Sequence, residues 1–246
     1  MAWQSPKTDW GRADGVRDSD LNRIEGNILH LYGMSVNADI TIYVNGSSGN
    51  DTSGSGTAAA PYKTITKALS VLPRNIDRHV VVINISAGTY LDAVTIRGFS
   101  GVITLRLTGT TTINSLAIDG CTVAYGGAQL NVSNGISLTN GAGFYGSDII
   151  YVGGANQVGI SVRNGSCMSV LQAVNVSNAT SVAIDVYSQG RFYASTIGGS
   201  NNSTGIIAST GGVVCYGSMS MTATTKHMAS TGGRIYSGAQ TSIPNY

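Results

Sequence analysis

The stretch GRFYASTIGGSNNSTGIIAST, residues 190–210, decides the fold, because residues 211–231 repeat its layout as GGVVCYGSMSMTATTKHMAST. Each stretch opens with glycine, carries two strand-like runs and ends in a polar turn. Similar units begin at Gly120, Gly141 and Gly165, and a shorter one begins at Gly232. A repeat of roughly 20–25 residues without a helical pattern predicts an all-β, single-stranded parallel β-helix with one coil per repeat. A leucine-rich repeat would need columns of leucine, which is scarce here.

Two columns of residues align within these units. The first column is Ala124, Phe144, Cys167, Phe192, Cys215 and Ile235. The second, one residue later, is Tyr125, Tyr145, Met168, Tyr193, Tyr216 and Tyr236. Adjacent residues of a strand point to opposite faces, so a first column inside the coil places the second outside. We therefore expect an inner ladder and an outer aromatic ladder, with like residues about 4.8 Å apart between coils.

The same alignment gives a third column and predicts how far apart two of the cysteines lie. The third column is Ile160, Ile184, Ile206 and Met228. Cys167 and Cys215 are predicted to lie two coils apart, roughly 10 Å, which exceeds the ~7 Å limit on the Cα separation of a disulfide. With three cysteines in the chain, we expect reduced, buried thiols that pack as small hydrophobes.

The composition separates the amino-terminal head from the body. Charged residues make up 11% of the 246 residues, Gly accounts for 33 of them, and the net charge is only +2. Such a small charge gives no reason to expect nucleic acid or an anionic membrane as a partner. No stretch has the length of a transmembrane segment and no signal peptide is visible, so we expect synthesis in a cytoplasm. Both tryptophans, Trp3 and Trp10, lie in the head.

The region in front of the repeats predicts a cap for the β-helix. Ile65, Ala68, Leu69 and Leu72 lie on one face of a short helix that Pro73 ends. Strands are expected around this helix at residues 40–44, 79–86, 93–98 and 102–109. The end of a solenoid needs a cover, because bare coils expose core and unpaired backbone.

This front region carries a family resemblance. IYVNGSSGNDTSGSGTAAAPYKTITKALSVLP, residues 42–73, followed by INISAGTYLDAVTIRGFSG, residues 83–101, resembles the start of the pectin-lyase-like right-handed β-helix superfamily. That superfamily includes pectate lyases, pectin methylesterases and many phage tailspikes. The head, WQSPKTDWGRADGVRDSDLNRIEGNI, residues 3–28, resembles the amino-terminal segment of tail and baseplate fibre proteins from phages of Gram-positive bacteria. Together the resemblances cover roughly residues 1–110 and imply a virion tail location.

The head also contains a heptad stripe. Its 3-4-3 spacing is carried by Leu21, Ile24, Ile28 and Leu31. A helix over residues 19–33 is too short to be stable alone, so the stripe must pack on something. It can pack against its own β-helix or form a parallel coiled coil between chains. The resemblance to phage fibres implies a homotrimer, with Trp3 and Trp10 either docking on other tail proteins or packing locally.

Catalytic signals are weak. The acids after residue 90 are Asp92, Asp119, Asp148 and Asp185. They fall at different phases of the repeat, so we expect them not to share a face, and no catalytic motif of the lyases or esterases is visible. Neither the three histidines nor Asn50-Asp51 forms a metal-ligand pattern, and the latter is read as a turn. We therefore predict no metal, no cofactor and no catalytic residue, although acids of neighbouring chains could meet across a trimer groove.

The outer tyrosines are the candidate site. Tyrosine offers a flat apolar face and a hydroxyl, which suit sugar rings. The binding residues we predict are Tyr125, Tyr145, Tyr193, Tyr216 and Tyr236. The same ladder could instead pack between subunits.

These observations combine into one expectation of organisation and function. Residues 1–38 form a tail-attachment and trimerisation segment, 39–110 a front and cap region, and 111–246 the repeats. We expect a non-enzymatic phage tail protein that binds host cell-wall polysaccharide. The alternatives are a tailspike-type depolymerase and a structural spacer of the tail.

Overall fold

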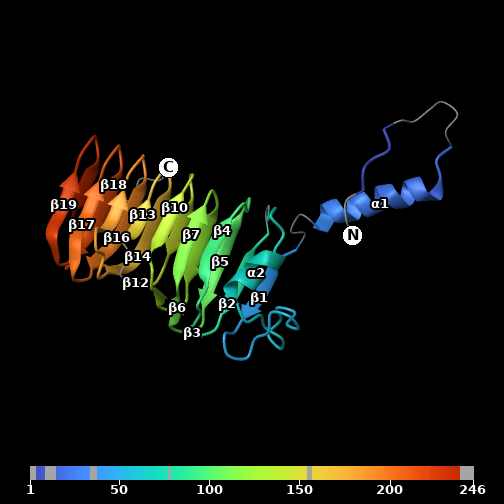
Figure 1. Cartoon of the computed structure of the whole chain (residues 1–246), viewed down its shortest axis with the longest axis horizontal. Coiled ribbons are helices and arrows are strands. Elements are labelled where there is room, and N and C mark those ends of the chain that lie inside the picture. The colour runs from blue at the N-terminus through green and yellow to red at the C-terminus, as the bar shows by residue number, and fades with distance from the viewer. Residues whose placement is uncertain (1–3, 9–14, 34–37, 77–78, 154–156, 239–246) are drawn as a thin grey trace.

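The protein is a parallel β-solenoid of about seven coils with two short helices (Figure 1). The computed structural model describes residues 4–8, 15–33, 38–76, 79–153 and 157–238. For residues 31–33 only the backbone is described. The predicted parallel β-helix and its two helices are confirmed.

One sheet, here called the long sheet, has 13 strands. Its first row is β1 (Ile40–Val44), β2 (Val81–Ile85), β5 (Val102–Leu107), β8 (Thr122–Gly126), β11 (Gly143–Gly146), β14 (Cys167–Val176), β16 (Arg191–Gly198), β18 (Val213–Met219) and β20 (Arg234–Ser237). Its second row is β3 (Gly88–Thr89), β6 (Thr111–Ile113), β9 (Leu130–Val132) and β12 (Ile150–Val152). The two rows merge in β14, which pairs with both β11 and β12.

The other sheet, here called the second sheet, has seven strands. They are β4 (Ala93–Arg97), β7 (Ser115–Asp119), β10 (Ile136–Thr139), β13 (Val158–Val162), β15 (Val182–Val186), β17 (Asn202–Ala208) and β19 (Ala223–Ala229). Each strand pairs in parallel with its neighbours one coil away. Both sheets continue across residue 110, since β3 pairs with β6 in the long sheet and β4 pairs with β7 in the second sheet.

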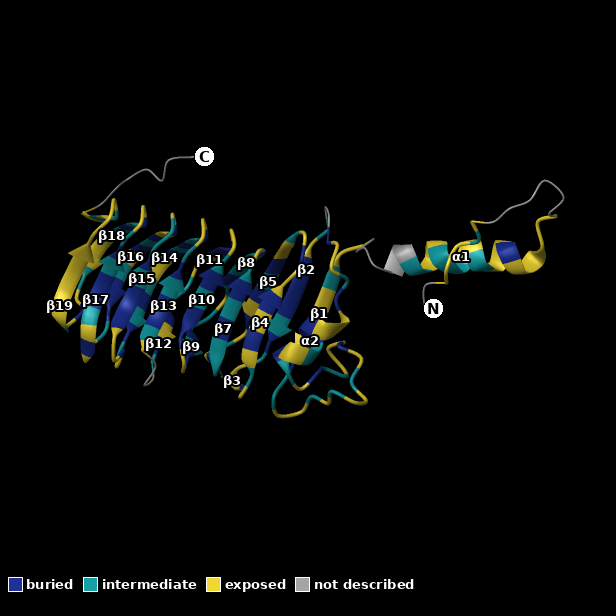
Figure 2. Ribbon diagram, turned by 45° about the horizontal axis from the view of Figure 1, so that its top comes forward, coloured by how far each residue is buried: buried dark blue, intermediate teal, exposed yellow. Residues whose placement is uncertain are grey.

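The core is a set of apolar ladders inside the coils, coloured dark blue in Figure 2. In the long sheet one ladder runs Ile103, Val123, Phe144, Met168, Phe192, Val214 and Ile235. Phe144 and Phe192 are fully buried. Burial of such a side chain stabilises the fold by roughly 1.5–3 kcal/mol, so these ladders supply most of the driving force.

The predicted columns are wrong by one residue in several coils. Phe144 pairs with Val123 and Met168, where we expected Ala124 and Cys167. In the same way Phe192 pairs with Val214 instead of Cys215. In the second sheet Ile206 pairs with His227 instead of Met228. In the runs of the long sheet two neighbouring residues are both apolar or small, so alternation of hydrophobicity alone does not fix which one points inward.

The turns at one corner of the coils determine which residues of the following strands point inward. The turns there place two consecutive residues at positive φ, as in Asn140-Gly141, Asn164-Gly165, Ser188-Gln189, Thr210-Gly211 and Thr231-Gly232. The position after each turn is a buried small residue in Ala142, Ser166, Gly190 and Gly212. A Cβ at Gly190 would lie 2.2 Å from the carbonyl oxygen of Val162, so the corner admits no larger residue there.

The amino-terminal end of the solenoid is covered by α2 (Ile65–Val71), as predicted. Ile65, Ala68 and Leu69 are buried, and the Thr64 side chain caps the helix by accepting from the Lys67 amide. Asp92 accepts from the amides of Ile65 and Thr66. This end of the solenoid is thereby closed with both its apolar and its polar groups satisfied.

At the other end, the last described coil exposes its inward-facing side. Every residue of β19 except Ala223 is exposed, although its partners in β17 are largely buried (Figure 2). The inner column changes from Ile206 to His227 in this coil. Between β19 and β20 lies a hollow of about 410 Å³.

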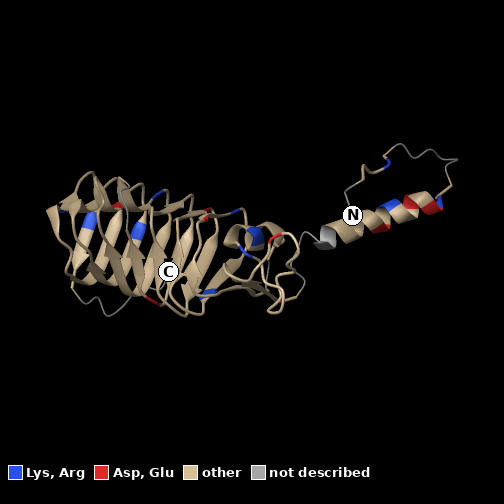
Figure 3. Ribbon diagram, turned by 60° about the horizontal axis from the view of Figure 1, so that its bottom comes forward, with Lys and Arg blue, Asp and Glu red and all other residues tan. Residues whose placement is uncertain are grey.

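The head helix α1 (Asp18–Gly33) lies beyond the amino-terminal end of the solenoid and covers neither sheet (Figure 1). Its start is fixed by Asp20, whose carboxylate accepts from the Arg17 amide. The preceding segment returns along the helix, since Gln4 and Asn27 exchange two hydrogen bonds of 2.9 and 2.8 Å. Charged residues crowd on α1 and are sparse over the coils (Figure 3).

Candidate functional site

A groove of about 900 Å³ lies on the outer face of the long sheet, over β8, β11, β14 and β16. We call it the long-sheet groove. Tyr145 and Tyr193 line it, Ser169 lies between them, and Leu171, Gln189 and Arg191 border it. A hollow of about 400 Å³ adjoins it through Ala124, Tyr125 and Ser147 and adds Arg106.

The two tyrosines alternate with small residues along the solenoid. Tyr145 pairs with Ala124 and Ser169, and Ser169 pairs with Tyr193. Two coils therefore separate the tyrosines, about 10 Å at the ~4.8 Å strand spacing. The small residue between two large ones creates the hollow, which a continuous tyrosine ladder would fill.

Tyr145 lies along its own strand. A Cβ placed at Gly143 would be 2.9 Å from Cε2 of Tyr145 and 3.3 Å from Cγ2 of Thr122. The ring thus occupies the space over Gly143, and Tyr145 is still 48% exposed. Burial, with a smaller contribution from the neighbouring Cys167, raises the pKa of the Tyr145 hydroxyl, which remains a neutral donor at physiological pH. The result is a flat aromatic surface with a polar tip.

A β-bulge borders the groove. The register between β14 and β16 shifts between Val170 and Ala173, so β14 contains one more residue than its partner. Leu171, inside the bulge, is 67% exposed and lines the groove. Bulges often redirect a side chain next to a functional site, and here the bulge adds an apolar edge to the groove.

Gln189 and Arg191 form the polar border. Gln189 has φ of +64°, while the equivalent turn residues Gly141, Gly165 and Gly211 are glycines. Arg191 is exposed, at the start of β16. Sequence reasoning missed Gln189 and Leu171, although the absence of glycine from this one turn was a visible signal for Gln189.

The predicted orientation is wrong for Tyr125 and Tyr216, which are 3% and 6% exposed. The register turns both side chains into the coil. The Tyr125 hydroxyl contacts the carbonyl oxygens of Ala128 and Ile149, and burial followed by the charge of Asp148 raises its pKa. Gly146 makes room for the ring, because a Cβ there would lie 2.9 Å from Cδ1 of Tyr125. These two tyrosines are core residues.

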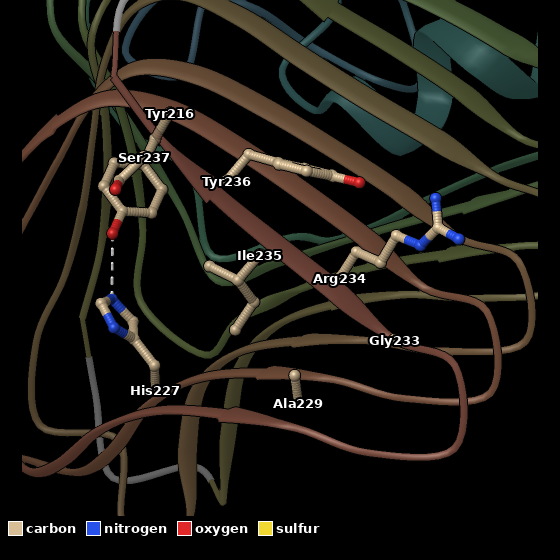
Figure 4. Close-up of a pocket in the computed structure, with 8 residues that line it drawn as sticks. All are labelled: Tyr216, His227, Ala229, Gly233, Arg234, Ile235, Tyr236 and Ser237. Atoms are coloured by element: carbon tan, nitrogen blue, oxygen red, sulfur yellow. Dashed lines mark hydrogen bonds between the residues drawn. The ribbon is translucent and has the colours of Figure 1, made fainter.

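Tyr236 lies in the outer ladder, two coils beyond Tyr193 and separated from it by Cys215. It is 39% exposed and borders the hollow between β19 and β20. Figure 4 shows Ile235 pointing from β20 toward His227, whose Nε2 lies 3.1 Å from the Tyr216 hydroxyl. Tyr236 therefore belongs to the exposed end and not to the long-sheet groove.

The three cysteines are unpaired. Cys121 is buried, but Cys167 and Cys215 are only half-buried, so the prediction of three buried thiols is wrong for two of them. Both point outward in β14 and β18, because the inner positions beside them belong to Met168 and Val214. Burial raises the pKa of all three thiols.

The two acids of the second sheet, Asp119 and Asp185, are too far apart to act together. Asp119 and Asp185 both lie on the outer face of the second sheet, contrary to our expectation, but three coils apart, about 14 Å at the ~4.8 Å spacing. Glycoside hydrolysis needs carboxylates within about 9.5 Å. Asp148 accepts from the Gly127 amide and the Ser147 hydroxyl. Burial raises the pKa of Asp185, partly offset by Arg163.

The loop of Asn50 and Asp51 is a turn, as predicted. Asn50 Oδ1 accepts from the amides of Thr52 and Ser53. Asp51 accepts from the Lys63 and Thr64 amides beside α2, close to the Asp92 cap. Burial would raise its pKa, but these hydrogen bonds lower it overall. Among the residues that the structure describes, no three His, Cys, Asp or Glu side chains are placed to hold a metal ion.

The head stripe is not covered by the described part of the chain. Leu21, Ile24 and Ile28 are 51%, 47% and 46% exposed. The side chain of Leu31, and both Trp3 and Trp10, lie outside the described residues. Of the two alternatives for the stripe, packing of α1 against its own β-helix is therefore not observed for these three side chains within the described residues.

Comparison of the chain with family models, with curated proteins and with solved structures finds no match. In the described ranges, no helix has the length and apolar character needed to cross a membrane.

Proposed function

We propose that the protein is a tail protein of a phage or phage-like particle that binds host cell-wall polysaccharide in the long-sheet groove without cleaving it. One observation carries the binding proposal: two outward tyrosines stand two coils apart with Ser169 between them. The phage context rests on the resemblance of the head and front region, residues 1–110, to tail fibres and tailspikes.

The groove suits an extended sugar chain. Tyr145 offers a flat ring against which the apolar face of a sugar can stack, with its hydroxyl free to bond the sugar's rim. A separation of about 10 Å between the tyrosines allows two rings of one chain to be held at once. The groove is lined by residues of four successive coils, from Ala124 on β8 to Tyr193 on β16, so a chain of several sugars can contact it along the solenoid.

The exposed stripe of α1 supports association of chains. Leu21, Ile24 and Ile28 form one apolar face of a helix too short to be stable by itself. A parallel trimeric coiled coil would bury this face and bring three grooves together. Several weak saccharide contacts would then act together on one surface, which raises the effective affinity.

The binding test uses alanine substitutions of the two outward tyrosines, of which Tyr145 is exposed and Tyr193 is half-buried. Tyr145→Ala and Tyr193→Ala are each expected to weaken binding to purified wall polysaccharide about tenfold, from the ~1.4 kcal/mol of one aromatic contact. Tyr151→Ala is the matched control, since Tyr151 is 42% exposed on the same sheet but does not line the groove. Equal losses in all three variants, or no binding by the wild type to cells or polymer, would overturn the proposal.

Two further measurements separate the alternatives. Incubation with the polymer followed by sizing is expected to leave its length unchanged, and shortening would favour a depolymerase. Ile24→Asp with Ile28→Asp is expected to reduce the solution mass from trimer to monomer, measured by light scattering. Leu29→Asp is the control, because Leu29 is equally exposed but lies off the stripe. An unchanged mass in the double variant would contradict the coiled coil.

A further inference from the structure

Charge in the long-sheet groove is one-sided. Arg191 is the one ionised side chain among the described residues that line the groove. Arg106 is the one ionised side chain among the described residues that line the adjoining hollow. Asp148 follows the lining residue Ser147 and accepts hydrogen bonds from the Gly127 amide, the Ser147 hydroxyl and the Gln172 side chain. A cleft lined by one sign of charge attracts the opposite sign.

The border of the groove also contains a turn that departs from the pattern of the neighbouring coils. Gln189 adopts φ of +64° at a turn position where the neighbouring coils have glycine. A non-glycine residue in the left-handed region costs about 1 kcal/mol relative to glycine. Its backbone amide donates to Thr210, a bond that a glycine would make equally well. The side chain, which lines the groove, is therefore the feature that distinguishes this turn.

Gln189 and Arg191 lie on either side of Gly190 at one edge of the groove. Their side chains can bind different groups of one ligand. The guanidinium of Arg191 can form two parallel hydrogen bonds to a carboxylate or phosphate. The amide of Gln189 offers both a donor and an acceptor to neighbouring sugar hydroxyls. Tyr145 and Tyr193 supply the stacking surfaces beside them.

We propose that the groove selects acidic polysaccharide, with Arg191 pairing with a carboxylate or phosphate of the chain and Gln189 hydrogen-bonding the sugar that carries it. This inference rests on the proposed function and assigns the chemical class of its ligand. In this proposal Gln189 is a specificity-determining residue at a turn position that the neighbouring coils fill with glycine.

The test compares the full chain with three polymers by calorimetry at several salt concentrations. The polymers are polygalacturonate for carboxylates, phosphomannan for phosphodiesters, and dextran as a neutral chain. We expect one or both acidic polymers to bind at least tenfold more tightly than dextran, with affinity that falls as salt rises. The ratio between the two acidic arms identifies the anionic group.

Arg191→Gln is expected to remove most of the preference for acidic polymer and to leave dextran binding unchanged. Arg97→Gln is the matched control, because Arg97 is an exposed arginine on the second sheet. Gln189→Gly is expected to weaken acidic polymer binding about threefold to tenfold while the melting temperature stays the same or rises. A merely structural Gln189 would give a lower melting temperature without a change in affinity.

The outcomes separate this inference from the proposed function. Tight binding of dextran that depends on Tyr145 would leave the proposed function standing and overturn the acidic preference. Equal losses in Arg191→Gln and Arg97→Gln would also overturn it, since they would reflect overall charge. Absence of binding to all three polymers and to host cells would overturn both, and would favour packing of the groove against another subunit.

Discussion

Tyr125 and Tyr145 sit in adjacent coils of the same sheet, yet they belong to different parts of the molecule. Tyr125 points into the coil, where its ring fills the space left by Gly146 and its hydroxyl contacts two carbonyl groups. Tyr145 points outward and lies over Gly143 beside the groove. One residue of register separates a structural role from a surface role, and in each case a glycine provides the space that the ring needs.

The largest test of this contrast uses neighbouring residues on opposite faces. Phe144→Ala is expected to reduce the free energy of unfolding by about 3–5 kcal/mol, because Phe144 is fully buried. Tyr145→Ala is expected to change it by less than about 1 kcal/mol, since half of that side chain is in solvent. Urea titration followed by circular dichroism measures both. Similar losses would mean that Tyr145 is part of the packed structure.

Removal of a single hydroxyl gives a medium-sized effect. Tyr125→Phe leaves the carbonyl groups of Ala128 and Ile149 without that partner and is expected to cost about 1–3 kcal/mol. Tyr145→Phe serves as the outward control and is expected to leave the free energy of unfolding within about 0.5 kcal/mol of the wild type. An equal cost in the two variants would contradict the difference in burial.

The cysteines give the smallest and most local test. Burial raises the pKa of each thiol above 9.0, so at neutral pH the native thiols are protonated and react slowly. The outward Cys167 and Cys215 are expected to be alkylated sooner than Cys121, and all three more slowly than in urea. Because the pKa of each thiol is higher in the folded protein, folding favours the protonated thiol. The free energy of unfolding is therefore highest below the pKa of the unfolded thiols, and it falls as the pH rises through the pKa of the folded protein. Rapid alkylation of Cys121 at pH 7.5 would contradict its burial.

The fold could be predicted from the sequence because its signals are periodic. The repeat length gives one coil, and the turn glycines and asparagines need positive φ, as the turns at Asn140 and Asn164 show. The helix α2 was predicted because its apolar face is a local feature, although it ends at Val71 and Leu72 already has an extended backbone. The register was less secure, because Cys167-Met168 and Val214-Cys215 each offer two residues that suit the core. The small residue after each turn, such as Ser166 or Gly212, would have fixed it.

The site could be predicted only in part for the same reason. A one-residue error placed Tyr125 and Tyr216 on the surface, while Tyr145, Tyr193 and Tyr236 were placed correctly. The groove itself depends on what stands between tyrosines, and Ser169 carries no signal until its coil is aligned. Leu171 reaches the groove through a bulge, which alters the side-chain alternation that sequence patterns assume.

The alternation of Tyr145, Ser169 and Tyr193 constrains how such a protein can lengthen or shorten in evolution. Each coil contacts only its neighbours, so whole coils can be duplicated or deleted with little harm to the rest. Removal of the one coil that contains Ser169 would bring the two tyrosines to about 4.8 Å and eliminate the space between them. Insertion or loss of two coils at a time would preserve the alternation. Selection on ligand binding would therefore favour gain or loss of an even number of coils. The stability of the scaffold alone allows gain or loss of an odd or an even number.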